Sequence, residues 1–514
     1  MVNYLIRRLC LMVPTILGIT FMVFMLLALA PGGIGAGLAV SGGQMSDTSK
    51  VAQMQAYLED RYGLNDPVVV QYLRWLGRIS PVKFGERDLR MPTGDRISAP
   101  REISAPPMEW AFALPAKPEV VFSPTIGDGQ VDEFKKLQRE AEGARRSYIG
   151  AERFFKDALA DYVRELGAPW TERLEPKGGA DPEKFRDLPL DDLRSGAAPG
   201  GSPKSIALRA AVTDMHVKWA KAEETRQRAY IAFLAKPYPE SGIGVVPGFV
   251  TLDTPDLGVA FSKNRPVWDL IATALPVTLL INAIAFPISY LIAIPTGILA
   301  SVRRGGWFDI GSGLAFLSLY SIPTVLAGVF AIGFLANRQY LGLFPVSGLH
   351  ASGAENYTFL PYWDAAGVWH EGWLLDMVWH VALPVLCLVY ASFAVLSKQT
   401  RAAMLENFNA DYVRTAKAKG VSRQDVVMRH VFRNSLLPLI TMFVGIFPAM
   451  LAGSVVIERI FTVPGMGSLI LEAIDLRDRE IILANTFMIA CVNLLALLLA
   501  DILYAVADPR VSYE

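Results

Sequence analysis

The chain has 514 residues, of which 52% are hydrophobic, and its 49 basic and 49 acidic residues balance at pH 7. This composition is too apolar for an ordinary soluble multidomain protein, and the balanced charge excludes a global attraction to nucleic acid or to an acidic partner. Cys10, Cys387 and Cys491 all lie in apolar runs. The sequence therefore offers neither a disulfide framework nor a cysteine-based metal site.

Six uncharged apolar runs recur along the chain. Each is long enough to cross the hydrocarbon core of a bilayer as a helix, which takes about 17–25 residues. The runs cover about 9–30, 270–302, 310–336, 377–397, 434–457 and 481–500. Prolines inside them, among them Pro276, Pro323 and Pro438, predict kinks. We expect an all-α integral membrane protein with six transmembrane helices.

The short basic flanks of these runs predict the orientation. Basic residues precede the first run, separate the second from the third, and crowd between the fourth and fifth. With six spans these flanks share one side, which the positive-inside rule makes the cytoplasm. Both termini are then expected to be cytoplasmic, and 31–269, 337–376 and 458–480 are expected to face outward.

The first run also has the features of a secretory signal peptide, because basic residues, an apolar core and a small-residue end follow one another. We favour a retained anchor, since the apolar stretch exceeds the ~7–15 residues of such signals and Pro31 follows it directly.

The long outer segment changes character along its length. Residues 31–80 are expected to contain short amphipathic helices, and 81–130 are rich in Pro and Gly. Heptad patterns then predict helices at about 131–166 and 204–236, joined by a segment rich in Gly and Pro. We interpret them as an antiparallel hairpin with coiled-coil-like packing; the alternative is a pair of solvated helices lying on another part of the protein.

Motifs for covalent chemistry are absent from the sequence. It contains no G-x-x-x-x-G-K-[ST] phosphate loop and no H-E-x-x-H, and its five histidines are scattered. No pair of carboxylates lies in mid-span, and His380 near the outer end of the fourth run is interpreted as a structural histidine. We therefore expect no enzyme activity, no catalytic residue, no cofactor and no bound metal.

A cationic segment interrupts the apolar runs between residues 411 and 440. Residues 402–419 are good helix formers with an apolar stripe, and Gly420 suits the left-handed residue that closes a helix. Ser422 and Asp425 have the spacing of a capping box, so a second helix is expected over 423–433. DNA binding is disfavoured by the membrane tether. An anionic-lipid patch and a docking lever moved by a cytoplasmic partner are the remaining interpretations.

At this point the sequence resembles a known family. "YVRTAKAKGVSRQDVVMRHVFRNSLLPLI" is similar to the EAA loop of binding-protein-dependent ABC importer permeases of the dipeptide/oligopeptide branch, which includes nickel and microcin permeases. Arg414-Thr415-Ala416 stands where Glu-Ala-Ala is usual, and Gly420 is the motif glycine. Further similar segments include "PTILGITFMVF", "RYGLNDPVVVQYLRWL", "SIPTVLAGV", "LGLFPVSG" and "ERIFTVPGMGSLILEAIDLRDREIILANTFM".

The resemblance implies a type I ABC importer permease in the bacterial inner membrane. It divides the chain into an anchor helix (1–30), short outer helices (31–80), a large inserted domain (81–250) and a permease core (270–507) with coupling loop 398–433. Implied partners are a second homologous permease, two cytoplasmic ATP-binding subunits, a periplasmic solute-binding protein and the lipid bilayer, without nucleic acid. The residues implied to dock the ATPase are Asp411, Tyr412, Arg414, Thr415, Ala416, Lys417, Ala418, Lys419, Gly420, Val421 and Ser422.

Two other functions stay open on the sequence. One is a membrane-anchored binding or sensor scaffold that uses the outer hairpin, and the other is an independent secondary carrier, which would need a coupling carboxylate in a span. The transported solute is open as well: peptide is the default of the family, and nickel, glutathione, peptide antibiotics or murein fragments are alternatives.

Overall fold

The computed structural model divides the chain into two compact units. One contains Met1–Pro31 and Leu257–Glu514, and the other contains Gly32–Asp256. The structure describes residues 2–29, 66–84, 89–90, 96–108, 111–124, 130–174, 180–188, 202–235, 242–246, 249–260, 262–263, 265–363 and 367–507. The short helices expected before residue 66 therefore lie outside the described residues.

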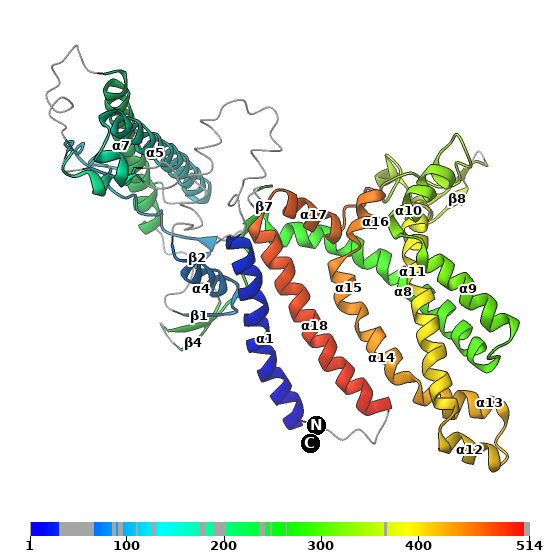
Figure 1. The fold of residues 1–514 in the computed structure, drawn as a ribbon. Helices are drawn as coiled ribbons and strands as arrows, with labels where there is room; N and C mark the ends of the chain where they lie inside the picture. The colour runs from blue at the N-terminus through cyan, green and yellow to red at the C-terminus, as the bar shows by residue number, and fades with distance from the viewer. Residues whose placement is uncertain are drawn as a thin grey trace. The chain divides into compact units, whose positions relative to one another are not determined.

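Long apolar helices build the first unit (Figure 1). Those long and apolar enough to cross a membrane are α1 (Val2–Leu29), α8 (Val267–Val302), α11 (Gly372–Phe408) and α18 (Arg479–Ala507). A fifth segment, Leu436–Ile460, comprises α14 (Leu436–Val444), α15 (Ile446–Ala452) and α16 (Val455–Ile460). Helix α1 packs against α18, and α8 packs against α11. The expected all-α membrane protein is confirmed.

The third apolar run is a bent pair rather than one rod. Helix α9 (Trp307–Ser321) meets α10 (Thr324–Phe330) and the π-helical turn η3 (Ala331–Ala336) at an angle of 86°. The bend lies at Ile322, whose extended backbone (φ −82°, ψ 117°) is the conformation favoured before a proline, here Pro323. Within the described residues there are five candidate spans, or six if the bent pair is one.

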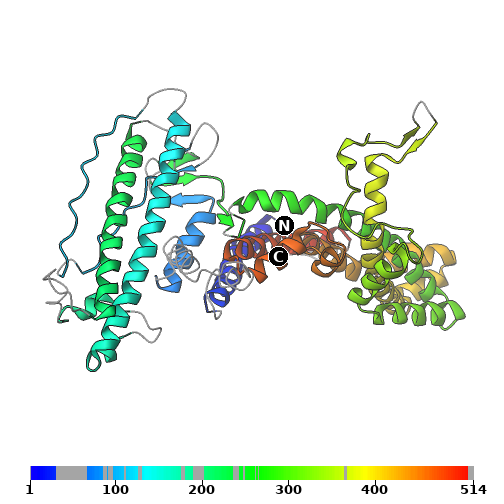
Figure 2. The same ribbon diagram turned by 90° about the horizontal axis from the view of Figure 1, so that it is seen from above.

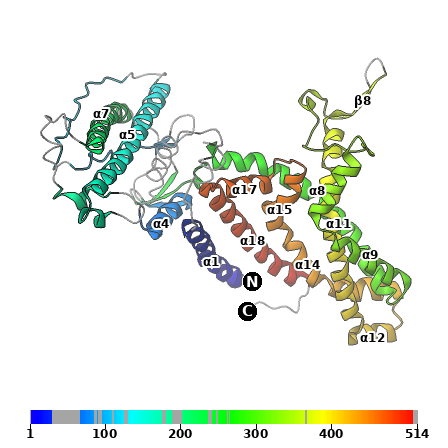
Figure 3. The same ribbon diagram turned by 45° about the horizontal axis from the view of Figure 1, so that its top comes forward.

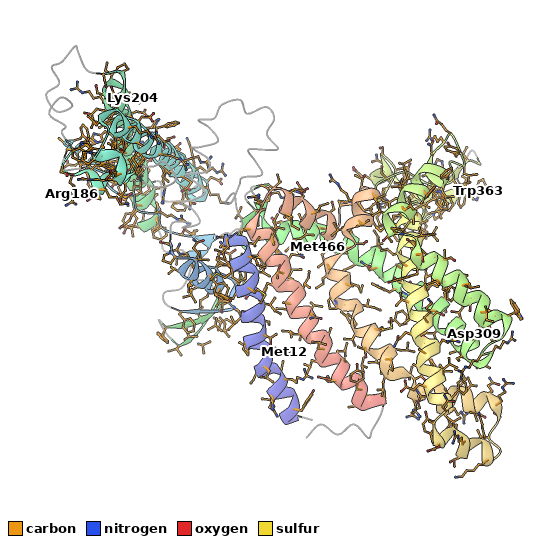
Figure 4. The ribbon with its side chains drawn as sticks, in the orientation of Figure 1. Met12, Arg186, Lys204, Asp309, Trp363 and Met466 are labelled. Atoms are coloured by element: carbon orange, nitrogen blue, oxygen red, sulfur yellow. The ribbon has the colours of Figure 1, made fainter. Side chains whose placement is uncertain are left out.

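Short elements lie at the end of these helices that is opposite to α12 (Asp411–Ala418). They are α17 (Met466–Asp475), the 3-10 turn η4 (Ala354–Asn356), and two hairpins, β6 (Val259–Ala260) with β7 (Arg265–Pro266) and β8 (Tyr362–Trp363) with β9 (Trp369–His370). Figure 4 shows Met466 and Trp363 at this end. The first backbone N–H groups of α11 are held here, because Trp373 donates to the Thr358 carbonyl at 2.8 Å.

Two long helices dominate the second unit (Figure 2). Helix α5 (Gln130–Leu166) and helix α7 (Pro203–Leu234) lie side by side, with the 3-10 turns η1 (Trp170–Arg173) and η2 (Pro182–Phe185) between them in sequence. Every member of the first period-seven stripe is buried, and the set is Phe134, Ala141, Tyr148, Phe155 and Tyr162. The stripe therefore faces a protein core rather than solvent.

Short strands accompany these helices, which the sequence did not indicate. A three-stranded antiparallel sheet has the order β1 (Val82–Phe84), β5 (Val250–Leu252), β4 (Ile243–Val246), and β2 (Leu89–Arg90) pairs with β3 (Arg96–Ile97). Helix α4 (Val68–Ile79) precedes β1. Strands of two to four residues are too short to show the alternation of a half-buried strand, which takes about 4–8 residues.

Candidate functional site

The cationic segment forms a compact elbow at the end of α11 (Figure 3). Helix α12 (Asp411–Ala418) ends in a Schellman motif, in which the Val421 N–H donates to the Ala416 carbonyl and the Gly420 N–H donates to the Lys417 carbonyl. Gly420 has φ +74°, the left-handed conformation that the motif requires. The turn predicted at Gly420 is therefore present.

A capped second helix follows the turn at once. The Asp425 N–H donates to Ser422 Oγ at 3.1 Å, and the Ser422 hydroxyl donates to Asp425 Oδ2 at 2.7 Å. This cap opens α13 (Arg423–Asp425), which continues as the π-helical turn η5 (Val426–Phe432) toward α14. The cap predicted at Ser422 is present, but most of the predicted helix over 423–433 is π-helical.

One expectation about the first helix is corrected by the structure. Residues 402–419 do not form one helix: α11 ends at Phe408, and Ala410 is extended (φ −71°, ψ 146°) before α12 begins. The break turns α12 away from the direction of α11, as Figure 3 shows. The elbow is therefore a separate element from the span formed by α11.

The inner face of the elbow packs against the ends of two spans. Val413 and Ala416 of α12 are buried, with exposed fractions of 0% and 6%. They belong to one apolar cluster with Met404 of α11, Val426, Val427 and Val431 of η5, and the partly buried Ile298, Val302, Phe408, Val421 and Phe432. Ala416 therefore packs on the inner side of the elbow and not on its exposed face.

The outer face of α12 is open and charged. Of the residues implied for docking, those exposed are Asp411, Tyr412, Arg414, Thr415, Lys417, Ala418, Lys419, Gly420 and Ser422. Asp411 and Arg414 face solvent most fully, with side chains 96% and 76% exposed. Ala416 is buried and Val421 is partly buried. Nine of the eleven residues thus lie where a second protein can reach them.

A polar chain leads from this outer face into the spans. The Tyr412 hydroxyl donates to Asn407 Oδ1 at 2.6 Å, and Asn407 Nδ2 donates to Ser435 Oγ at 3.1 Å and to the Ala403 carbonyl at 3.0 Å. Ser435, fully buried, donates to the Val431 carbonyl at 2.8 Å. This chain joins α12, the end of α11 and the start of α14. Sequence reasoning missed this chain, because no spacing rule connects Asn407 with Ser435.

Two further contacts connect α11 to its neighbours, α9 and α8. Arg401 of α11 donates from Nε and Nη2 to the carboxylate of Asp309 on α9, the second bond being 2.7 Å long. Figure 4 shows Asp309 at the end of α9 that lies toward the elbow. Gly297 of α8 touches α11 so closely that an added Cβ would lie 2.7 Å from the Ser397 carbonyl oxygen. These contacts hold α8 and α9 against α11.

A hollow of about 450 Å³ lies beside the elbow. Its apolar walls include Leu405, Phe408 and Val426, and its basic lining residues are Arg304, Lys417 and Arg423. Apolar walls with basic groups around them suit a partner segment that combines an apolar anchor with acidic neighbours.

Two other ionisable groups in this unit, His380 and Glu458, are held by hydrogen bonds. His380 Nδ1 lies 3.2 Å from the Asp376 carboxylate and 2.8 Å from the Asp376 carbonyl. Glu458 accepts from Thr278 Oγ1 at 3.1 Å and from the Ser468 N–H at 2.9 Å. Among the described residues no group of three or more His, Cys, Asp or Glu could hold a metal ion. These groups have the contacts of structural residues.

Comparisons with known proteins converge on one kind of protein. The sequence profile of the family "Binding-protein-dependent transport system inner membrane component" matches residues 293–513. The chain is 34% identical over 260 residues to the inner membrane ABC transporter permease protein YejB of Escherichia coli O157:H7, covering 50% of this chain and 68% of that protein.

Two further relatives are similar over the same share of the chain. The oligopeptide transport system permease protein AppB of Bacillus subtilis is 36% identical over 251 residues, which cover 49% of this chain and 74% of AppB. The dipeptide transport system permease protein DppB of Escherichia coli K12 is 34% identical over 266 residues, which cover 50% of this chain and 77% of DppB.

Proposed function

The chain belongs to the family of binding-protein-dependent transport system inner membrane components, and from this premise we propose that the exposed face of α12 docks an ATP-hydrolysing subunit. The protein is a multi-pass permease subunit of an ATP-driven ABC importer, a transport component and not an enzyme. The observation that carries the docking proposal is the construction of the elbow: a rigid apolar inner face and an open charged outer face.

The partners follow from the class of transporter. A second homologous permease completes the pathway, two ATP-binding subunits drive it, and a solute-binding protein delivers cargo to its outer mouth. The cargo is a peptide or a similar small solute, a proposal supported by relatives whose names specify dipeptide or oligopeptide transport. The relatives are transport permeases, so they lend no support to the sensor scaffold.

The docking residues divide by role. Arg414, Lys417 and Lys419 present cations to an acidic rim on the ATPase, and Asp411 and Tyr412 lie on the same exposed helix. Gly420, Val421 and Ser422 fix the turn between α12 and α13, while Ala416 braces it from inside. Closure of the ATPase pair pushes α12, and the chain Tyr412–Asn407–Ser435 passes the displacement to α11 and α14 as rigid-body rotation of packed spans.

The orientation is proposed on the same grounds. With α12 on the cytoplasmic side, both termini are cytoplasmic and the β8–β9 hairpin faces outward. Basic residues concentrated around the elbow and at Arg303 and Arg304 support this assignment through the positive-inside rule.

Residues 81–250 are proposed to be an insertion relative to other permeases of the family, built around the α5–α7 pair. We assign it contact with the solute-binding protein or with the paired permease. Deleting 81–250 should impair uptake or docking of the binding protein while assembly with the ATPase persists. Unchanged uptake and docking in the deletion variant would contradict this role.

Site-specific crosslinking tests the docking proposal directly. A photoreactive residue at Lys417, which is exposed on α12, should capture the ATP-binding subunit in native membranes. The matched control is the same residue at Glu355, which is exposed at the opposite end of the spans. Capture at both positions, or at neither, would refute docking on α12.

A further inference from the structure

A hollow of about 480 Å³ lies beside the β8–β9 hairpin, where α11 begins. Its lining comes from the end of η4 and the residues after it, from both strands of the hairpin and from the start of α11. The aromatic lining residues are Tyr357, Tyr362, Trp369 and His370, and the acidic one is Glu371. No lysine or arginine is among the described residues that line it. The hollow therefore combines aromatic rings with a carboxylate.

Hydrogen bonds fix the segment before the hairpin against the start of α11. The Trp373 N–H donates to the Thr358 carbonyl at 2.8 Å, and the Leu374 N–H donates to the Phe359 carbonyl at 3.1 Å. These bonds satisfy N–H groups in the first turn of α11, whose partial positive charge would otherwise oppose a bound cation. They also hold this wall of the hollow in place before a ligand arrives, which lowers the entropic cost of binding.

The aromatic residues of the hairpin form cross-strand pairs. Tyr362 lies opposite His370, and their rings are stacked with centroids 4.8 Å apart. Trp363, labelled in Figure 4, lies opposite Trp369, and their ring centroids are 5.2 Å apart. Such pairs stabilise a hairpin whose strands are only two residues long. Tyr362 and Trp369 are nevertheless 42% and 47% exposed, so a ligand can reach them.

The charge around the hollow is negative. The Glu371 carboxylate is exposed and has no hydrogen bond or ion pair with any residue that the structure describes. Between residues 337 and 376 the sequence has one basic residue, Arg338, and four acidic ones, Glu355, Asp364, Glu371 and Asp376. This part of the chain therefore carries an excess of negative charge, which favours cations over anions at the hollow.

We propose that this hollow binds a small organic cation through its ammonium group. Aromatic faces and carboxylates are the groups that hold ammonium ions in proteins. The volume falls in the range of about 300–1,000 Å³ typical of small-molecule sites. A single carboxylate suits an organic cation better than Ca²⁺ or Mg²⁺, which take about six or more oxygen ligands. The site lies away from the elbow and goes beyond the ATPase docking and transport proposed above.

Binding can be measured on the full-length chain labelled with 5-fluorotryptophan, in a maltoside detergent and a phosphate buffer free of amines. The fluorine resonance of Trp369 is assigned by its loss in Trp369→Phe, and it reports on the hollow itself. Choline probes a quaternary ammonium, and trialanine amide probes the amino end of a peptide. We expect one or both to shift this resonance saturably, with a Kd on the order of 1 mM because the contacts are exposed.

Uncharged analogues separate the ammonium group from the rest of each probe. They are 3,3-dimethylbutanol, which has the shape of choline, and N-acetyl-trialanine amide, whose amino end is neutral. Each should bind severalfold more weakly than its charged counterpart. A shift with choline alone would support a quaternary ammonium site, and a shift with trialanine amide alone would support a site for the amino end of a peptide.

Variants connect the binding to the hollow. Glu371 is exposed, so Glu371→Gln should leave the fold intact and weaken binding of the cation about two- to fivefold. Tyr357→Leu removes an aromatic face and should have an effect of similar size, whereas Tyr357→Phe should retain most of the affinity. The double variant Tyr357→Leu/Glu371→Gln should bind about tenfold more weakly. The matched control is Glu355→Gln, which removes an exposed charge outside the lining.

Three results would overturn the proposal. They are the absence of a saturable shift with both cations, uncharged analogues that bind as tightly as the cations, and an unchanged affinity in the double variant.

Discussion

The hydroxyl of Tyr412 donates a 2.6 Å hydrogen bond to Oδ1 of Asn407, across the break that separates α12 from α11. Asn407 also donates to Ser435 at the start of the fifth span. One chain of hydrogen bonds therefore connects α12, the end of α11 and the start of α14. An exposed residue of the elbow is thereby connected to a fully buried one.

Tyr412→Phe should uncouple the elbow without dismantling it. The ring stays, and the lost hydrogen bond contributes about 0.5–1.5 kcal/mol. We expect uptake in the assembled transporter to fall severalfold while the ATPase still binds. Thr486→Val in α18 is the control, because the Thr486 hydroxyl bonds only to the Ile482 carbonyl of its own helix in the described contacts. Equal uptake by Tyr412→Phe and the control would show that the hydrogen bond from Tyr412 to Asn407 does not contribute to coupling between the ATPase and the spans.

Gly420→Ala should destabilise the elbow through its backbone alone. No atom lies within 4 Å of an added Cβ, so the penalty comes from φ +74° and amounts to about 1–2 kcal/mol. Gly311→Ala in α9 is the matched control: its added Cβ also meets open space, but its helical backbone favours alanine by about 0.5–1 kcal/mol. Thermal unfolding in detergent should shift in opposite directions for the two variants, and a downward shift of equal size in both would contradict this reasoning.

The features that could be predicted from the sequence are local in the chain. Apolar runs identify spans because length and hydropathy are properties of one segment. The turn at Gly420 and the cap at Ser422 depend on residues three to five positions apart. The heptad stripe of α5 identifies the buried face of that helix, although it does not identify what covers the face.

Features that join distant segments could not be predicted in this way. Asn407 and Ser435 are 28 positions apart, and Asp309 and Arg401 are 92 apart, so no spacing rule connects them. The break at Ala410 lies between Asn409 and Asp411, residue types that favour helix ends and turns, but good helix formers on either side obscure this local signal. A proline indicates a kink at Pro323, but the 86° angle depends on what packs around it.

The Arg401–Asp309 ion pair should contribute more to the free energy of unfolding than an ion pair on the surface does. Asp309 is 7% exposed, so Arg401→Gln leaves a buried carboxylate with the Gly305 N–H as its remaining donor among the described contacts, at a cost of about 1–3 kcal/mol. Adding Asp309→Asn to Arg401→Gln should restore part of the lost unfolding free energy, because no buried charge is then left uncompensated.

The exposed pair Arg429–Asp425 is the control for this measurement. Its side chains are 80% and 43% exposed, so Arg429→Gln should cost no more than about 0.5 kcal/mol. Both costs can be read from denaturant unfolding in detergent. If the Arg401→Gln/Asp309→Asn double variant lost as much unfolding free energy as the two single variants added together, Arg401 and Asp309 would not be coupled.

Acid should loosen the α5–α7 pair through His216. Burial lowers the pKa of this half-buried imidazole below its usual 6.5, because the charged form is disfavoured in the folded chain. Between the two pKa values the unfolded state therefore binds more protons than the folded state, so stability rises with pH. The contribution of the neutral imidazole is fully present above pH ~6.5 and is lost as the pH falls through that value toward the lowered pKa.

Hydrogen exchange of α7 amides, corrected for the intrinsic pH dependence of exchange, should show less protection at pH ~5.5 than at pH ~7.5. His216→Gln should flatten this dependence, whereas His430→Gln, in the other unit, should leave it intact. An unaltered slope in His216→Gln would assign the acid sensitivity to other groups.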